Sequence, residues 1–92
     1  MNDSRASFGC TICPIKNVIY VGGGYTYGEI NKQCEMYSIQ ADTWTRLPDL
    51  NENKCSTSLC VLNSKALYSF GGLSKFENNI QLISTIERLD LV

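Results

Sequence analysis

The chain has 92 residues and no histidine, which removes the side chain that most often serves as a metal ligand. A structural zinc site is usually tetrahedral and is built from paired cysteines, or from cysteines together with histidines. The sequence also lacks any apolar run of the roughly 18 residues that a transmembrane helix needs, and its N-terminus lacks the apolar core of a signal peptide. We therefore expect no membrane partner and no secretion, and we assign the chain to the cytoplasm.

Charge is sparse and evenly mixed. Eight Lys and Arg residues stand against nine Asp and Glu residues, giving a net charge of −1, and the basic residues are scattered along the chain. A nucleic-acid surface normally shows a concentrated basic stripe, so we expect no nucleic-acid partner. Apolar residues make up 43% of the chain, a globular share that argues against wholesale disorder.

Five cysteines are an odd number, so they cannot all be paired with one another. Cys10 and Cys13 form a CxxC pair, a spacing found in metal and redox sites. Redox pairs of this kind usually lie at a helix N-terminus, whereas these two lie in a strand-like segment. Cys34, Cys55 and Cys60 show no ligand spacing. We interpret all five as small buried hydrophobic residues in a reducing compartment, and we expect no metal or other cofactor.

What the chain does contain is an internal repeat. Residues 17–24 read NVIYVGGG and residues 65–72 read KALYSFGG, 48 positions further along. Each copy runs from an apolar segment into a glycine doublet. A repeat of about 40 to 50 residues made of short strands is typical of a propeller blade. Glycine reaches positive φ and tolerates close backbone approach, so we assign both doublets to a sharp turn after an inner strand.

Apolar alternation between turn residues predicts the strands of two consecutive blades. In the first copy the predicted strands are residues 7–13, 18–21, 34–39 and 43–47. In the second copy they are residues 56–62, 66–70 and 86–91. Residues 73–84 are expected to form a polar loop that is four residues longer than its counterpart, an extension that costs little closure entropy. The predicted fold class is all-β: one complete four-stranded antiparallel blade followed by three strands of a second.

Aromatic residues complete a motif on this frame. A glycine doublet, then a tyrosine, then a tryptophan seven positions later and a Leu-Pro pair resembles the Kelch repeat. The residues that carry the resemblance are Gly23, Gly24, Tyr37, Trp44, Leu47 and Pro48 in the first copy and Gly71 and Gly72 in the second. Leu89 stands where the second copy should have its tyrosine, and the matching tryptophan would fall beyond Val92. Arg5 also suits the family, which often has a basic residue before the first strand.

The resemblance implies a β-propeller of several blades, of which this chain holds about 1.75 repeats. We divide it into an extension (residues 1–4), a first Kelch repeat (residues 5–48) and an incomplete second repeat (residues 49–92). About three repeats are the usual minimum for a stable array. We therefore expect the chain alone to be marginal or prone to aggregate, and to be a fragment or a piece that closes a propeller with further blades or by association.

In function, the resemblance implies a protein–protein interaction module or scaffold, including a possible role as a ubiquitin-ligase adaptor, with protein partners of unknown identity. Functional contacts concentrate on loops over a rigid scaffold, so we expect binding through the loops after the glycine doublets. The candidate contact residues are Tyr25, Tyr27, Lys75, Phe76, Glu77 and Asn79. Tyr37, Trp44, Leu89 and the doublets are assigned structural roles.

The alternative is that these blades belong to a propeller enzyme similar to galactose oxidase. A copper-radical oxidase of that type needs histidine ligands and a Tyr–Cys pair, and the absence of histidine disfavours it. Glu29, Glu35 and Glu87 invite an acid–base interpretation. Because Glu35 and Glu87 occupy equivalent positions of the repeat, a structural role is favoured for them. We predict no catalytic residue and no enzymatic activity.

Overall fold

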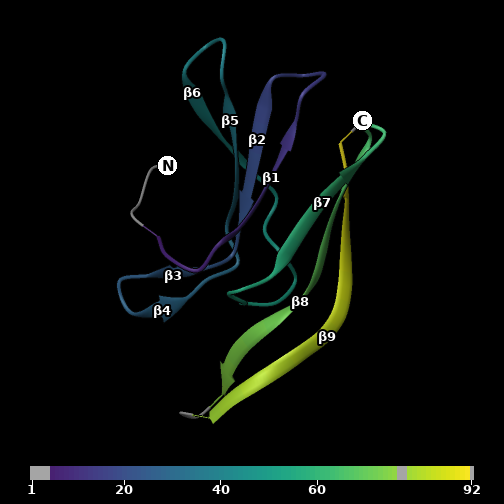
Figure 1. The fold of residues 1–92 in the computed structure, drawn as a ribbon. Coiled ribbons are helices and arrows are strands. Elements are labelled where there is room, and N and C mark those ends of the chain that lie inside the picture. Colours follow the sequence, from purple (N-terminus) through teal and green to yellow (C-terminus); the bar gives the residue numbers. More distant parts are fainter. Residues whose placement is uncertain (1–4, 77–78, 92) are drawn as a thin grey trace.

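The computed structural model describes residues 5–76 and 79–91, and the regular structure in this part of the chain is entirely β. Two antiparallel sheets stand beside each other as neighbouring blades, with a small hairpin at one end (Figure 1). Blade 1 is the sheet β1-β2-β5-β6, and blade 2 is the sheet β7-β8-β9. The expected fold class, a complete four-stranded blade followed by three strands of a second, is confirmed. None of the described residues forms a helix with the length and apolar character needed to cross a membrane.

Blade 1 is a meander whose strands are short and regularly paired. They are β1 (Gly9–Cys13), β2 (Val18–Gly22), β5 (Cys34–Ser38) and β6 (Thr43–Leu47). The polar stretch after Gly24 is not wholly irregular, because β3 (Tyr25–Thr26) pairs with β4 (Glu29–Ile30). Tyr27 and Gly28 both have positive φ, 52° and 80°, as the two central residues of a tight hairpin turn require.

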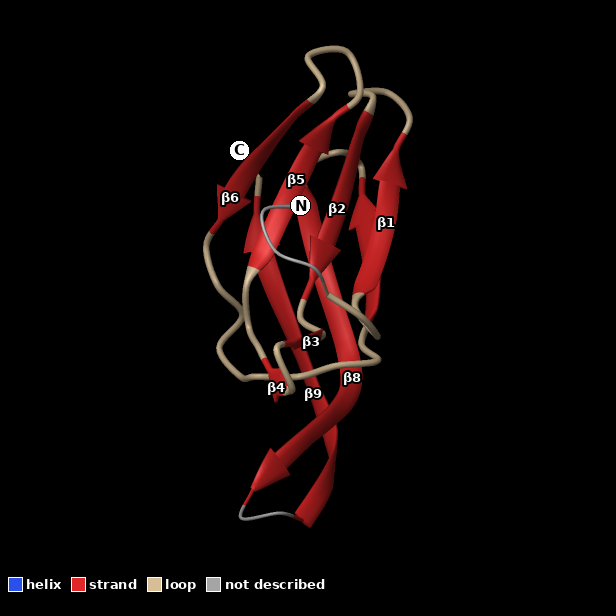
Figure 2. Cartoon of the chain, turned by 90° about the vertical axis from the view of Figure 1, so that its left-hand side faces the viewer, coloured by secondary structure: helices blue, strands red, loops and turns tan. Residues whose placement is uncertain are grey.

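Blade 2 corrects one expectation. Its strands are β7 (Ser58–Leu62), β8 (Ala66–Phe76) and β9 (Asn79–Asp90). Residues 73–84 were expected to form a loop, but β8 and β9 stay paired well beyond the blade, from Gly72 opposite Ile83 to Phe76 opposite Asn79. We call residues 73–76 and 79–83 the ribbon, and it projects past the end of the blades (Figure 2). Neither strand of the ribbon contains a proline or a glycine, the residues that interrupt strand pairing. Polar side chains alone do not end a strand pair, so the pairing continues through this segment.

The core lies between the two blades. Side chains alternate across a strand, so one face of blade 1 presents Cys13, Val18 and Tyr20 to Leu67 of blade 2, and all four are buried. Partly buried side chains from both sheets pack around them: Met36, Leu47, Leu59, Val61, Leu89 and Leu91. Complete burial of a side chain of Tyr20's size is worth about 2 to 3 kcal/mol. This single shared layer joins the blades.

The opposite faces of both blades remain open in the described structure. Ile12 and Ile39 are exposed on blade 1, and Phe70 and Ile86 are exposed on blade 2. Each of these residues alternates with the ones that build the core, so they lie on the faces that point away from it. The molecule therefore presents one apolar sheet face on each side.

The cysteines divide between these environments, which corrects a second expectation. Cys13, Cys34 and Cys55 are buried and Cys60 is half-buried, but Cys10 is exposed. Residues three positions apart on a strand point to opposite faces, so Cys13 enters the core while Cys10 lies on the open face of blade 1. The same geometry separates the two thiols of the CxxC pair. Among the described residues, no three Cys, Asp or Glu side chains are grouped to hold a metal ion.

Candidate functional site

The loop end of the blades is where the chain segments come closest together. Gly23 and Gly24 have φ values of 69° and 104°. A Cβ on Gly23 would lie 2.3 Å from the carbonyl oxygen of Lys54, and one on Gly24 would lie 2.8 Å from that of Ala6. The Gly24 N–H donates to the same Lys54 oxygen at 2.8 Å. The first doublet thus anchors the connection between the blades against the end of β2.

The second copy repeats this construction. Gly71 and Gly72 have φ values of 60° and 120°, and a Cβ on Gly72 would lie 2.7 Å from the carbonyl oxygen of Cys55. Cys55 and Leu73 exchange backbone hydrogen bonds at 2.8 Å, as Ala6 and Tyr25 do in the first copy. Both doublets therefore mark the place where the segment that precedes a blade crosses its second strand.

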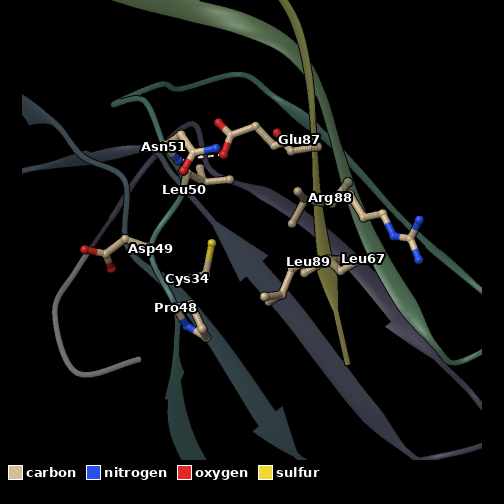
Figure 3. A pocket seen from close by; sticks show the side chains of 11 residues that line it. Cys34, Pro48, Asp49, Leu50, Asn51, Leu67, Glu87, Arg88 and Leu89 are labelled. Atoms are coloured by element: carbon tan, nitrogen blue, oxygen red, sulfur yellow. Dashed lines mark hydrogen bonds between the residues drawn. The ribbon is translucent and has the colours of Figure 1, made fainter. Parts of the chain in front are cut away.

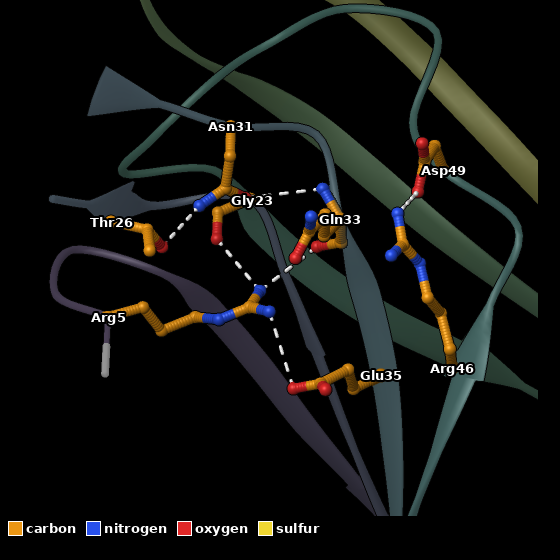
Figure 4. Close-up of polar contacts among 8 residues, drawn as sticks. All are labelled: Arg5, Gly23, Thr26, Asn31, Gln33, Glu35, Arg46 and Asp49. Carbon is orange, nitrogen blue, oxygen red and sulfur yellow. Dashed lines mark hydrogen bonds and ion pairs between the residues drawn. The ribbon is translucent and has the colours of Figure 1, made fainter. Parts of the chain in front are cut away.

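A buried basic–acidic pair lies beside each doublet. Arg5 donates to the carbonyl oxygens of Gly23 and Gln33 at 3.0 Å, and its Nη2 lies 3.3 Å from Glu35 Oε2 (Figure 4). In blade 2 the Nζ of Lys54 lies 2.9 Å from Glu87 Oε2. That contact meets the distance of an ion pair but not the angle of a hydrogen bond.

These ion pairs assign structural roles to Glu35 and Glu87. The Glu87 carboxylate also accepts a hydrogen bond from the Asn51 backbone N–H at 2.6 Å. Glu35 and Glu87 each hold a connecting segment onto a sheet, in equivalent positions of the two blades.

Asn31 fixes the β3–β4 hairpin in place. Its Nδ2 donates to Thr26 Oγ1 at 2.7 Å, and its Oδ1 accepts from the Gln33 backbone N–H at 3.2 Å. Its own backbone N–H donates to Gly24, and its carbonyl oxygen accepts from Lys54. One residue therefore ties the hairpin to the doublet and to the connection between blades. Sequence reasoning missed it, because an asparagine in a polar loop gives no sign of these hydrogen bonds and Lys54 comes from a distant segment.

The hairpin and the connection enclose an open groove of about 440 Å³ at this end of blade 1. The side chains that line it mix both signs of charge with amide, hydroxyl and aromatic groups: Thr26, Tyr27, Glu29, Ile30, Asn31, Lys32, Gln33, Arg46, Asp49 and Asn53. Arg46 and Asp49 form an exposed ion pair at 3.2 Å across its wall (Figure 4). We call this feature the loop-end groove.

The structure does not gather the predicted contact residues into one site. Tyr25 and Tyr27 lie on the hairpin, and of the two only Tyr27 lines the loop-end groove. Lys75 and Asn79 are exposed on the ribbon, and Phe76 ends β8, so these three belong to a different element. Glu77 lies outside the described residues. Arg46 and Lys32 line the groove but were not predicted, Arg46 because it is a residue of strand β6 rather than of a loop.

A second hollow, of about 240 Å³, lies between the blades next to Pro48, Leu50 and Leu89 (Figure 3). Its thiol, Cys34, has its pKa raised to about 11 because burial disfavours the charged form. Two carboxylates line it: Glu87 is held by Lys54 and Asn51, and Asp49 pairs with Arg46. The thiol is therefore protonated at neutral pH, and both carboxylates are engaged by other groups of the chain.

The aromatic positions of the repeat are packing positions. Tyr37 and Trp44 pair directly across β5 and β6, with ring centroids 4.9 Å apart. Tyr37 also donates to an Asp42 carboxylate oxygen, a hydrogen bond that raises the tyrosine pKa. In blade 2, Leu89 stands opposite Leu67 as Tyr37 stands opposite Ile19, and Leu89 packs against the core between the blades. The open face that carries Tyr37 is therefore equivalent to a face that blade 2 buries.

Two successive antiparallel blades with repeated glycine doublets and repeated buried ion pairs define a β-propeller repeat protein. A sequence profile of the Kelch motif matches residues 6–51, which is half of the chain. The chain belongs to the Kelch-repeat family.

Several curated relatives carry the same repeat over nearly the whole chain. The chain is 29% identical over 90 residues to a RING finger domain and kelch repeat-containing protein of Dictyostelium discoideum, covering 98% of the chain and 9% of that protein. It is 28% identical to Kelch-like protein 40 of Xenopus laevis, covering 99% and 14%. It is 33% identical to the F-box/kelch-repeat protein SKIP30 of Arabidopsis thaliana, covering 90% and 22%. The chain thus spans less than a quarter of these relatives.

Proposed function

We propose that the chain is a protein-interaction module that binds a protein partner through the loop-end groove. The observation that carries this proposal is Tyr27, whose side chain is 86% exposed at the rim of the groove although it is a large aromatic residue. Tyrosine is enriched at protein interfaces because its ring supplies contact area while its hydroxyl supplies a hydrogen bond. The hairpin that bears Tyr27 is held rigidly by Asn31, so little ordering entropy is lost on binding.

The charges of the groove favour a polypeptide as the ligand. Lys32 and Arg46 are balanced by Glu29 and Asp49, so the groove attracts neither a polyanion nor a polycation as a whole. A protein segment that carries both signs of charge fits this lining. Carboxylates of such a segment would find Arg46 accessible beside its exposed partner Asp49.

Two of the relatives combine Kelch repeats with a RING finger or an F-box in their names. By analogy we propose a finer role, recruitment of a protein substrate to a ubiquitin ligase, with the chain acting in the cytoplasm and without catalysis of its own. The engagement of Glu35 and Glu87 in buried pairs supports a non-catalytic role. The half-buried and buried free thiols suit a reducing compartment.

The experiment compares proximity-labelled neighbours of three forms of the protein in cells. The Tyr27→Ala/Arg46→Ala form alters the groove. The Ile15→Ala form removes an equally exposed apolar side chain from the β1–β2 turn, at the other end of blade 1 (Figure 1). A direct partner should lose at least roughly tenfold in labelling with the groove variant and keep its labelling with Ile15→Ala. The partner is then produced pure, and its Kd is measured by calorimetry for each form. Equal Kd values for the groove variant and the unaltered protein would contradict the proposal.

A further inference from the structure

The ribbon has an open strand edge, on β9, that lies beyond the part of β9 that a fourth blade strand would pair with. In blade 1 the fourth strand, β6, pairs with the five residues Cys34–Ser38 of β5. The equivalent residues of β9 are 86–90, because Ala66 stands opposite Asp90 as Val18 stands opposite Ser38. A fourth strand placed as in blade 1 would therefore leave the β9 edge at residues 79–83 unpaired.

This edge lacks the features with which proteins normally protect exposed strands. Edge strands are commonly guarded by charged side chains, proline or a bulge. Residues 79–83 read NIQLI and contain no charge and no proline, and the extra residue of the register shift lies beyond them, in residues 84–85 opposite Gly71. The other free edge of the ribbon, on β8, carries the exposed Lys75, and the outer edge of blade 1 carries the exposed Arg46. Along residues 79–83 the β9 edge carries no charged side chain.

Its side chains are also unusually apolar for a surface. Ile80 is 74% exposed and Leu82 is 86% exposed, and both point to the same face of the ribbon. Their neighbours across the strand pair are Lys75 for Ile80 and Leu73 for Leu82, and the exposed fractions show that neither neighbour covers them. The apolar face and the open edge adjoin each other.

We infer that two copies of this chain pair antiparallel along residues 79–83 of β9. An antiparallel register centred on Gln81 places Ile80 opposite Leu82 of the second copy, and Leu82 opposite Ile80. The two Gln81 amides then face each other on the other side of the sheet, and no charged residue stands opposite another charge. Such a pairing continues the sheet as β8-β9-β9-β8 and is isologous, so every contact except the central Gln81–Gln81 pair occurs twice.

The register gives a sharp test on the full chain. Sedimentation equilibrium should show a reversible dimer across the micromolar range, and hydrogen exchange should show protection of residues 79–83 that grows with concentration. Gln81→Glu and Gln81→Lys each place like charges directly opposite, and each should weaken the dimer at least roughly tenfold. Mixing the two variants places opposite charges across the pair and should restore the dimer.

Apolar variants provide the matched control. Leu82→Lys should abolish association, whereas Ile15→Lys, at a position that is also 86% exposed, should not. Circular dichroism checks that each variant stays folded. If Leu82→Lys does not fold, the mixing experiment with the two Gln81 variants still tests the inference. A chain that is monomeric at all concentrations overturns the inference. So does association that Ile12→Lys on the open face of blade 1 abolishes while both Gln81 variants leave it intact. Loss of partner binding at the loop-end groove has no bearing on this result.

Discussion

Replacing Gly23 with alanine should destabilise the chain far more than the same change at Gly28. Both glycines have positive φ, 69° and 80°, so an alanine is strained at either site by about 1 kcal/mol. They differ in their surroundings. A Cβ on Gly28 meets nothing within 4 Å, whereas one on Gly23 would lie 2.3 Å from the Lys54 carbonyl oxygen. The pair therefore separates backbone strain from close approach.

The additional cost at Gly23 follows from what Lys54 holds. Its carbonyl oxygen must retreat by about 0.7 Å to reach 3.0 Å, the shortest separation that real Cβ atoms show. That movement stretches the 2.8 Å hydrogen bond from Gly24 and shifts the residue whose Nζ pairs with Glu87. A buried hydrogen bond left unmade costs about 1 to 3 kcal/mol. We expect Gly23→Ala to cost about 3 kcal/mol in total, against about 1 kcal/mol for Gly28→Ala.

The assay is urea unfolding followed by circular dichroism, with thermal unfolding as a second measurement. An osmolyte in both keeps a chain with two open sheet faces folded at the start. For a domain of this size, the difference of about 2 kcal/mol corresponds to roughly 8 to 16 °C in Tm. Free energies of unfolding that agree within about 0.5 kcal/mol for the two variants would refute the steric argument, and would show that the conformational preference alone requires glycine.

Two further outcomes follow from the buried groups. Lys54→Ala leaves the Glu87 carboxylate buried without its cation and should cost about 3 kcal/mol in free energy of unfolding. Arg88→Ala removes only an exposed pair with Asp90 and should cost less than about 1 kcal/mol. Equal losses in urea unfolding would contradict the structural role of the Lys54–Glu87 pair. With a thiol pKa of about 11, Cys34 is only about one part in a thousand thiolate at pH 8. Iodoacetamide should therefore modify the exposed Cys10 much faster than Cys34 in the folded chain. Peptide mapping that finds equal rates for the two cysteines would contradict the burial of Cys34. Raising the pH toward 11 should accelerate the reaction of Cys34, because its thiolate fraction rises with pH.

The blades could be predicted from the sequence because their determinants are local and repeated. The apolar, strand-forming residues of 18–21 and 66–70, each followed by glycines, identify two second strands, and the same offset aligns Gly23 with Gly71. The repeat also predicted a structural role for Glu35 and Glu87, which occur at equivalent positions and each pair with a basic residue. When the same residue type occurs at one position of both copies, a structural role shared by the two blades accounts for it without a catalytic role.

The ribbon and the loop-end groove could not be predicted in the same way. Polar residues such as Ser74, Lys75 and Gln81 are compatible with either a loop or a solvated strand pair, and composition alone favoured the loop. The groove depends on contacts between segments far apart in the chain. Asn31 beside the hairpin accepts a backbone hydrogen bond from Lys54 of the connection, so the lining exists only once blade 1 and the connection are packed together.

The two copies also constrain any surface that packs on the open face of blade 2. That face is equivalent to the face of blade 1 that builds the core, and Tyr68 repeats Tyr20 there. Two of its differences from the first copy change the shape and charge of the face: Phe70 stands where blade 1 has Gly22, and Arg88 stands where it has Met36. Gly22 lets Leu59 approach to 3.6 Å from the position of its absent Cβ, and Phe70 removes that space. A surface that covers blade 2 must therefore be hollow opposite Phe70 and must accommodate the Arg88–Asp90 pair, so a second copy of blade 2 would not fit it.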